Sequence, residues 1–327
     1  MSHVVIVGAG HAGGTCAALL RQYGHAGPIT LIGTEPLAPY QRPPLSKAWL
    51  KGEADGDSLL LRPLEFYAEH DIDLRTDATV EAVDLQTRTV RLADGESLGW
   101  DRLVLATGSI ARPLPIAGAD QPEVLALRTA ADADRLKAAL TPGAHLVVVG
   151  AGYVGLEVAA SARALGCTAV VVEREPRVLA RVASPELSAF MEAYHRAQGV
   201  EIVTGASVVE IEPGARCLRL SDGRRLEGGA VLVGVGALAM DGLARAAGLD
   251  CDDGVIVDAS ARTSHPDVFA VGDCTRRPLS LYASMARLES VPNALEQAKQ
   301  AACAIAGRSP PPPEVPWFWS DQYELKL

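Results

Sequence analysis

The sequence predicts an α/β protein with two Rossmann-like dinucleotide-binding domains, each a parallel sheet with a small antiparallel meander. Two observations lead to this fold class. A glycine fingerprint that follows a buried apolar strand and opens a helix occurs twice, at residues 8–13 and 150–155. In both halves an acidic residue follows the next strand, and a D-G turn and an apolar return strand come later. The chain therefore repeats one plan.

The first copy begins with the apolar run HVVIV at residues 3–7, which is typical of a strand buried in a parallel sheet. Gly8, Gly10 and Gly13 follow, then an alanine-rich helix to about residue 23 and a strand over 29–32 that ends near Glu35. In such a fingerprint the first glycine permits a tight turn, the second admits a pyrophosphate, and the third lets the helix pack on the strand. The helix N-terminus offers N–H groups to the phosphates.

The second copy has the same order. HLVVV at residues 145–149 leads to Gly150, Gly152 and Gly155, then a helix to about residue 165 and a strand that ends at Glu173. Alternating segments around a D-G turn predict a meander over residues 79–100, and residues 207–238 repeat this pattern together with its apolar return strand. Two such units imply two dinucleotides, for which FAD and NAD(P)H are the natural pair.

Composition excludes several other classes. The net charge of −10 argues against nonspecific binding to nucleic acid or anionic membranes. Residues 144–162 are apolar, but Glu157 and the glycines favour a buried strand, turn and helix over a membrane span. The first residues enter a strand without a signal-peptide pattern, so we expect a cytoplasmic protein.

The six cysteines form no C-x-x-C or C-x-x-x-x-C pair, and none lies between Cys16 and Cys167. We expect them to be small buried hydrophobic residues in a reducing compartment, with no metal site. Residues 39–50, PYQRPPLSKAWL, carry Arg42 and Lys47 beside two prolines that disfavour helix and central strand. This pattern predicts a stiff loop that places the lysine.

Several motifs together resemble the FAD-dependent NADH–ferredoxin reductases of bacterial oxygenase systems, the putidaredoxin reductase-like group with a glutathione-reductase-type fold. They are VVIVGAG, PYQRPPLSKAWL, RLVLATG, GAGYVGLEVAA, VFAVGDC, RLESVPNALEQA and PWFWSDQYE, and they cover essentially the whole chain. The resemblance implies a flavoprotein oxidoreductase, a ferredoxin–NAD(+) reductase. It would take hydride from NADH to FAD and pass single electrons to a [2Fe–2S] ferredoxin that feeds a P450 or Rieske-type oxygenase.

The resemblance also implies the binding residues. Those for FAD are Gly8, Gly10, Ala12, Gly13, Glu35, Arg42, Lys47, Val80, Ala106, Thr107, Gly108, Arg128, Asp273, Val291 and Trp319. Those for NAD are Gly150, Gly152, Tyr153, Val154, Gly155, Glu157, Glu173 and Gly236. Val80 and Val291 would be apolar in any case, and Trp319 could instead pack at a domain junction.

The catalytic pair implied by the resemblance is Lys47 with Glu157, the lysine lying beside flavin N5 where disulfide reductases of this fold carry a cysteine pair. A buried ammonium needs a carboxylate partner. For the second dinucleotide, Glu173 favours NADH because a carboxylate repels a 2′-phosphate. Arg174 and Arg177 could oppose this preference by pairing with such a phosphate.

Ferredoxins of this type are acidic, so we expect a basic docking face, with Arg276 and Arg277 as candidates. The predicted domains are an FAD domain (1–112 and 239–309), an NAD domain (113–238), and a proline-rich linker with the start of a truncated C-terminal domain (310–327). Residues 323–327 alternate like a strand without partners, which is not stable alone. We expect a monomer or weak dimer.

Three alternatives stay open at this point. The first is another flavoprotein reductase, either a rubredoxin reductase or an NADH oxidase. The second is an NADH-sensing flavoprotein of the apoptosis-inducing-factor type, which shares this fold. The third is a purely structural role for the duplicated fold.

Overall fold

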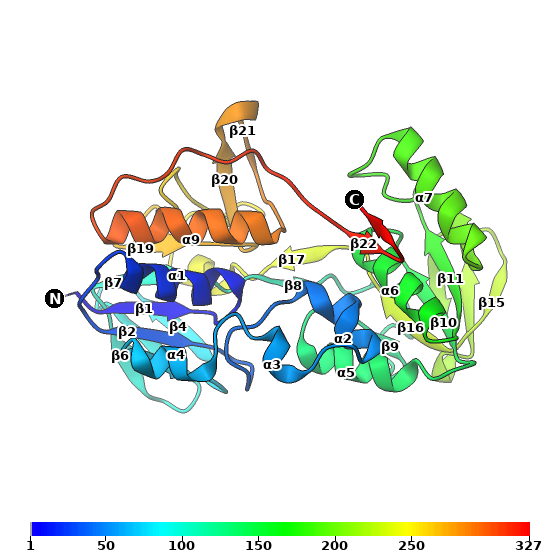
Figure 1. Cartoon of the computed structure of the whole chain (residues 1–327), viewed down its shortest axis with the longest axis horizontal. Helices are drawn as coiled ribbons and strands as arrows, with labels where there is room; N and C mark the ends of the chain where they lie inside the picture. Colours follow the sequence, from blue (N-terminus) through cyan, green and yellow to red (C-terminus); the bar gives the residue numbers. More distant parts are fainter. Residues whose placement is uncertain (1) are drawn as a thin grey trace. The chain divides into compact units, whose positions relative to one another are not determined.

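The computed structural model describes residues 2–327, which form two compact units (Figure 1). Unit 1 is formed by the residues up to Gln41, by Leu59–Ile110 and by Leu238–Phe318. Unit 2 is formed by Arg42–Ser58, Ala111–Ala237 and Trp319–Leu327. Unit 2 thus includes the proline-containing stretch after Gln41 and the C-terminal nine residues, which the sequence placed in other domains.

Unit 1 is built on a five-stranded parallel sheet with the order β19-β7-β1-β2-β3. The strands are β1 (Val4–Val7), β2 (Ile29–Ile32), β3 (Ile72–Arg75), β7 (Arg102–Leu105) and β19 (Val268–Ala270). Side chains alternate between the two faces of a strand. Val4 and Ile6 pack against α1 (His11–Gln22) and α9 (Val291–Ile305), whereas Val5 and Val7 pack against the meander.

The meander of unit 1 comprises β4 (Val80–Asp84), β5 (Thr89–Leu92) and β6 (Ser97–Gly99) and is antiparallel, as predicted. The remaining elements of this unit are α4 (Leu64–Glu69), α8 (Gly242–Ala246), β18 (Val255–Ile256), β20 (Thr275–Leu279), η3 (Ser280–Tyr282) and β21 (Ser284–Ala286). The short strands β8 (Ser109–Ala111) and β17 (Ala237–Ala239) pair where the chain passes between the units.

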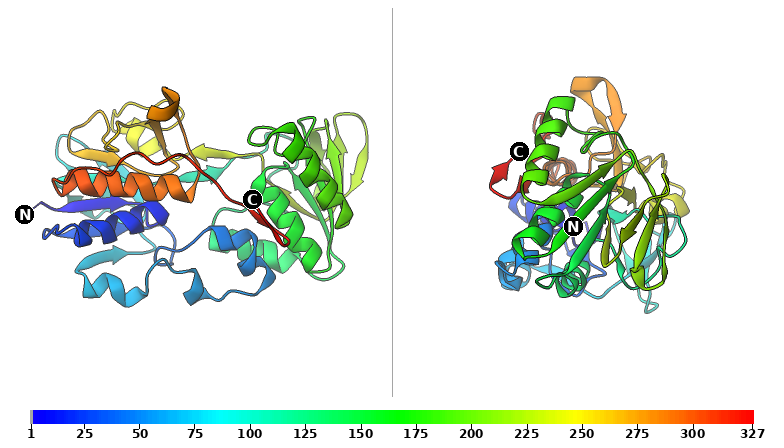
Figure 2. Two further views of the ribbon diagram at one scale, coloured as in Figure 1. Left: turned by 45° about the horizontal axis from the view of Figure 1, so that its top comes forward. Right: turned by 90° about the vertical axis from the view of Figure 1, so that its right-hand side faces the viewer.

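Unit 2 repeats the arrangement with a parallel sheet of order β12-β11-β10-β16-β9. Its strands are β9 (Val124–Leu125), β10 (His145–Val149), β11 (Thr168–Glu173), β12 (Val200–Thr204) and β16 (Ala230–Val233). One face is covered by α5 (Ala130–Ala139), α6 (Tyr153–Ala164) and α7 (Pro185–Ala197). The other is covered by β13 (Val208–Ile211), β14 (Cys217–Leu220) and β15 (Arg225–Glu227), with η2 (Pro213–Ala215) between β13 and β14. The right-hand view of Figure 2 shows the green helices and the yellow-green meander on opposite sides of this sheet.

The stretch predicted as a loop without helix is instead helical. Residues Pro43–Ser46 form the 3₁₀-helix η1, and Ala48–Lys51 and Gly56–Leu59 form the short helices α2 and α3. The two prolines occupy the first positions of η1, where a missing N–H removes no helical hydrogen bond. The prediction of no helix there was wrong, and the stiffness of the segment that carries Lys47 stays a prediction.

The C-terminal residues also differ from expectation. Asp321–Gln322 (β22) and Leu325–Lys326 (β23) pair as an antiparallel hairpin, so the strand is not partnerless. Tyr323 takes a positive φ of 54° at the turn, and Ser320 and Leu327 exchange backbone hydrogen bonds of 3.1 and 2.9 Å. Leu325 and Leu327 pack against the helix-side core of unit 2.

The apolar window at residues 144–162 is β10, a turn and α6, as predicted. Within residues 2–327, no helix combines the length and apolarity that crossing a bilayer requires.

Candidate functional site

The first fingerprint closes a tight turn between β1 and α1 in unit 1. Gly8 has φ +113°, and a Cβ there would lie 2.2 Å from the carbonyl oxygen of Ala106. A Cβ on Gly13 would lie 1.9 Å from the carbonyl oxygen of Gly8. Backbone cannot yield at such distances, so glycine is required at both positions. The buried Ala12 continues the close packing of this turn.

The other residues expected to bind FAD in unit 1 gather mainly at one edge of its sheet. Glu35, Ala106 and Asp273 follow the carboxyl ends of β2, β7 and β19, and Gly8 follows β1. Parallel strands bring these ends to one edge of the sheet. β1 is at the topological switch point, with β2 and β3 on one side of it and β7 and β19 on the other. Val80 and Val291 differ, because they begin β4 and α9.

The polar groups at this edge are already oriented. The Tyr40 hydroxyl donates to Glu35 Oε2 at 2.6 Å, and the Ser109 hydroxyl donates to Asp273 Oδ2 at 3.0 Å. Thr107 Oγ1 donates to the Met240 carbonyl at 2.6 Å, and Gly108 takes φ +71°. A carboxylate accepts hydrogen bonds, so Glu35 is of the right chemical type for ribose hydroxyls.

The two fingerprint helices begin differently from the other long helices of the described chain. Thr129, Ser184 and Ser290 cap α5, α7 and α9 through their side chains. Gly10 and Gly152, the N-cap residues of α1 and α6, have no side chain to cap with, and neither first turn carries an acidic residue. The first N–H groups and the positive end of each helix dipole are therefore suited to an anion such as a pyrophosphate.

In the second fingerprint, close backbone contacts require two of the three glycines. A Cβ on Gly150 would lie 2.4 Å from the Gly234 carbonyl oxygen, and one on Gly155 would lie 2.2 Å from the Gly150 carbonyl oxygen. Gly152 has an ordinary φ of −78°, and a Cβ there would meet no atom within 4 Å. Neither backbone strain nor packing requires a glycine at this position, so the open space beside it fits an approaching dinucleotide.

Glu173 lies at the end of β11 and holds the fingerprint loop. Its Oε2 accepts from the Ala151 N–H at 2.6 Å and its Oε1 from the Glu175 N–H at 2.9 Å. The Arg177 guanidinium donates to the carbonyls of Ala180 and Ala183 and to Ser188 Oγ. Because Arg177 is committed to these bonds, it is not positioned as a partner for a 2′-phosphate. Arg174 is exposed and paired with Glu175 at 3.0 Å.

The remaining residues expected to bind NAD surround the start of α6 and the end of β16. Tyr153 is the first residue of α6, and burial raises the pKa of its phenol. Val154 is 44% exposed. Gly236 has φ +107°, and a Cβ there would lie 3.9 Å from both Arg112 Nε and Arg181 Nη2. Sequence reasoning missed these two arginines, since neither belongs to a motif.

Lys47 and Glu157 form an ion pair within unit 2, with Nζ and Oε2 2.6 Å apart. The carboxylate of Glu157 is buried, and the Lys47 side chain is 19% exposed. Ser46 Oγ donates to Glu157 Oε2 at 2.5 Å, and Ser320 Oγ donates to Oε1 at 2.7 Å. The sequence did not indicate a role for either serine, although Ser46 lies in the motif PYQRPPLSKAWL and Ser320 in PWFWSDQYE. On the same unit, Arg42 Nη1 donates to the Arg128 carbonyl at 2.5 Å.

All six cysteines are free thiols. Cys16, Cys167, Cys274 and Cys303 are buried, whereas Cys217 and Cys251 are partly exposed, so the expected burial applies to four of the six. Burial raises the pKa of Cys16 to about 12 and also raises the pKa of Cys274. Such thiols are poor nucleophiles at neutral pH. Residues 2–327 bring together no group of His, Cys, Asp and Glu suited to a metal ion.

Comparison with known proteins places the chain in a family. The model of the pyridine nucleotide-disulphide oxidoreductases matches residues 2–298. This chain belongs to that family. It is 51% identical to the probable ferredoxin reductase CtmF of Castellaniella defragrans, over 99% of this chain and 80% of that protein. It is 38% identical to a rubredoxin-NAD(+) reductase of Pseudomonas putida, over 99% of this chain and 85% of that one.

Solved structures agree with the relatives. The chain superposes on the crystal structure of the covalent putidaredoxin reductase–putidaredoxin complex with a TM-score of 0.96 and 42% identity. The match covers 99% of this chain and 79% of that one. The predicted fold class and the resemblance to ferredoxin reductases are therefore confirmed.

One predicted docking residue is corrected by the structure. The side chain of Arg277 is 5% exposed and pairs with Glu296 at 2.6 Å and with Asn293 at 3.1 Å. A buried, paired guanidinium offers nothing to a protein partner, so Arg277 was wrong as a docking candidate. Arg276 is partly exposed and pairs with Asp252. Trp319, the first of the C-terminal residues of unit 2, is half-buried.

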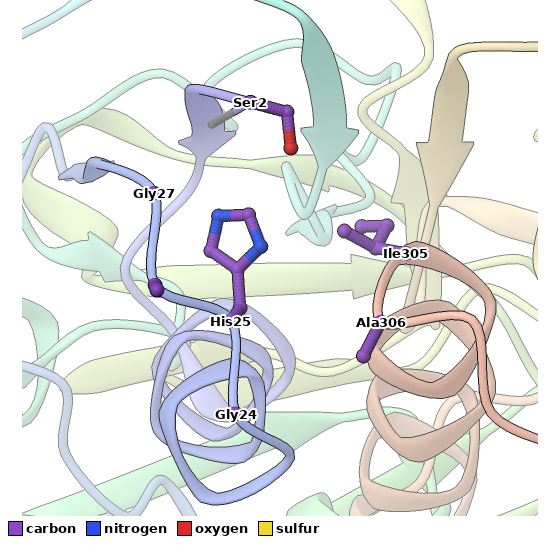
Figure 3. A pocket seen from close by; sticks show the side chains of 7 residues that line it. Ser2, Gly24, His25, Gly27, Ile305 and Ala306 are labelled. Carbon is purple, nitrogen blue, oxygen red and sulfur yellow. The ribbon is translucent and has the colours of Figure 1, made fainter.

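A shallow pocket of unit 1 lies apart from the fingerprint (Figure 3). It is lined by Ser2, Gly24, His25, Ala26, Gly27, Ile305 and Ala306. Apart from Ser2, which precedes β1, these residues lie where α1 and α9 end, whereas the fingerprint precedes α1. The pocket is therefore at the opposite end of α1 from the candidate dinucleotide site.

Proposed function

We propose that this protein is an FAD-dependent ferredoxin–NAD(+) reductase that takes electrons from NADH. The observation that carries the proposal is the Lys47–Glu157 ion pair in a chain that has two dinucleotide fingerprints. Its 51% identity to a probable ferredoxin reductase supports the same function. When bound, FAD supplies the chemistry, because it accepts a hydride from the nicotinamide and releases electrons singly.

We propose that unit 1 holds FAD and unit 2 holds NADH. In unit 1, the N-terminus of α1 with Gly8 and Gly10 binds the pyrophosphate, and Glu35 accepts from the ribose. The fit rests on the start of α1, which no side chain caps, and on the place of Glu35 after the carboxyl end of β2. Asp273, already oriented by Ser109, is the polar group at the end of β19.

In unit 2, the start of α6 binds the NADH pyrophosphate and Glu173 accepts from the adenosine ribose. A carboxylate at this position opposes a 2′-phosphate. Arg177 does not offset this effect, because its guanidinium donates to two loop carbonyls and to the Ser188 hydroxyl of α7. NADH is therefore the preferred nucleotide over NADPH.

Lys47 carries a positive charge at Nζ, and Glu157 keeps that ammonium in one place. If bound FAD lay within reach of this ammonium, the positive charge would stabilise negative charge added to the cofactor. Neither residue exchanges a proton with substrate in this scheme, so no general base is required.

The electron acceptor is a small [2Fe–2S] ferredoxin of an oxygenase system. A solved relative has been captured in covalent complex with putidaredoxin, which supports this class of partner. Arg276 remains a candidate docking residue, since its side chain is partly exposed. We also propose a cytoplasmic location, where NADH is supplied and where six free thiols persist.

A second candidate is a rubredoxin–NAD(+) reductase, favoured by the 38% identity to such an enzyme. The deciding experiment is anaerobic NADH titration of the purified protein, followed by turnover with ferredoxin, with rubredoxin and with O₂ as sole acceptor. We expect bleaching of a flavin spectrum and fastest turnover with ferredoxin. Fastest turnover with rubredoxin, or peroxide formation alone, would contradict the proposal. So would a stable reduced complex with negligible turnover, or a colourless protein.

A further inference from the structure

The C-terminal motif WSDQY contributes two buried polar side chains that the proposed function leaves unexplained. Ser320 and Gln322, both in unit 2, are 0% and 1% exposed. The residue that Gln322 meets, His195 on α7, is 0% exposed. Buried polar groups are expensive unless they are hydrogen-bonded, so a row of them needs a reason.

These residues form a continuous hydrogen-bond chain that ends on Glu157. Ser320 Oγ donates to Glu157 Oε1 at 2.7 Å, and Gln322 Nε2 donates to Ser320 Oγ at 3.0 Å. His195 Nε2 lies 2.7 Å from Gln322 Oε1. The Tyr323 hydroxyl lies 3.4 Å from His195 Nδ1.

The donors of this chain all point the same way. Because Gln322 uses its amide N–H₂ on Ser320, its Oε1 accepts, and His195 must carry its proton on Nε2. The neutral Nε2–H tautomer then accepts from Tyr323 at Nδ1. Burial lowers the pKa of His195, which agrees with a neutral ring. Every hydrogen bond from Tyr323 onward is therefore directed toward the carboxylate.

The geometry at Glu157 gives the chain a function. Lys47 and Ser46 both bind Oε2, and Ser320 alone among the described contacts binds Oε1. Contacts on one oxygen leave the carboxylate free to rotate, whereas contacts on both fix its plane. We propose that Ser320, Gln322 and His195 are positioning residues that orient Glu157 and, through it, the Lys47 ammonium. This inference rests on the proposed function of the Lys47–Glu157 pair.

The test compares Ser320→Ala with Ser188→Ala. Ser188 is a matched control, because its buried hydroxyl also lies in unit 2 but bonds Val178 and Arg177 instead of Glu157. Two quantities are measured: the midpoint potential of the bound flavin, and the ¹⁵N-resolved signal of the Lys47 ammonium in the flavin-free protein. Without the Ser320 hydroxyl, one hydrogen bond to the negative charge of Glu157 is lost, so the midpoint potential of the flavin should fall.

We expect Ser320→Ala to lower the potential by less than Lys47→Met does, to broaden the Lys47 signal, and to slow flavin reduction about fivefold. Ser188→Ala should change none of these. A second pair, His195→Gln and His195→Phe, tests the chain further from Glu157. The glutamine keeps an N–H donor and should retain the Lys47 signal, whereas phenylalanine should broaden it.

Two negative results are distinguishable. If Lys47→Met leaves the potential unchanged, the proposed role of the ion pair fails. If Lys47→Met lowers the potential but Ser320→Ala and His195→Phe behave like Ser188→Ala, the positioning inference alone is overturned.

Discussion

Lys47 and Glu157 lie 110 positions apart in the chain, yet Nζ of the first is 2.6 Å from Oε2 of the second. The pair joins the segment after η1 to the second turn of α6. Bringing the two residues together closes a long loop, so the folding of unit 2 must offset the entropic cost of that closure. Glu157 therefore belongs at once to the fingerprint helix and to the candidate catalytic pair.

Replacing Lys47 by methionine should destabilise unit 2. The substitution leaves the buried Glu157 carboxylate with two hydroxyl donors and no counter-charge. Breaking a buried ion pair from one side costs about 3 kcal/mol. Urea unfolding of the flavin-free protein measures this loss. The double variant Lys47→Met with Glu157→Gln should recover much of it, and a double variant as unstable as the single one would contradict the explanation.

Alanine substitutions at two glycines of the second fingerprint should have different effects, one on NADH binding and the other on folding stability. Gly152→Ala places a methyl group in open space and should leave thermal stability within about 0.5 kcal/mol. It should raise the KM for NADH, because the methyl group occupies the space beside the helix N-terminus. Gly155→Ala, with its Cβ 2.2 Å from a carbonyl oxygen, should lose about 3 kcal/mol or more. Equal effects of the two variants on KM and stability would refute this division.

Much of the fold could be predicted because the sequence repeats a pattern with a local physical cause. Apolar strands, fingerprint glycines and D-G turns act over a few residues, and both sheets and both meanders formed where these signals lie. The C-terminal hairpin was not predicted because its two short strands, β22 and β23, pair only with each other. The turn between them also uses a non-glycine residue, Tyr323, at positive φ. Local pattern reading does not detect such a turn.

The candidate site was less predictable, because its supporting contacts join distant segments. Ser46 and Ser320 bind Glu157 from 111 and 163 positions away, and no spacing rule connects them. The burial of Arg277 depends on Glu296 of α9, so its position after the strand motif did not indicate whether it was exposed. Pairwise chemistry of this kind becomes visible only when the elements are placed in space.

Arg177 should stabilise unit 2 and should not determine the preference for NADH over NADPH. Its guanidinium donates to two carbonyls and to Ser188, so Arg177→Gln should destabilise unit 2 by about 1–3 kcal/mol. The ratio of kcat/KM for NADH to that for NADPH should stay in favour of NADH and change less than twofold. Arg174→Gln, on an exposed residue, is the control for charge. A marked gain in NADH preference on removing Arg177 would show that it contacts the 2′ position.

The buried His195 should make stability depend on pH in a defined direction. Burial lowers its pKa in the folded state below the ordinary value of 6.5, so the unfolded chain binds a proton first on acidification. Stability is therefore fully present above about pH 6.5 and falls as pH decreases toward the folded-state pKa. Tyr323 stays neutral throughout, since burial raises its pKa to about 12.

Urea unfolding at pH 7.5 and 5.5 should show a smaller loss of unfolding free energy at the lower pH in His195→Gln than in the native protein. The stability of the His195→Gln variant should still decrease as the pH falls, because the pKa of His25 in unit 1 is also lowered. His25→Gln should remove only this His25 contribution to the pH dependence. An unchanged slope in His195→Gln would mean that His195 titrates alike in both states.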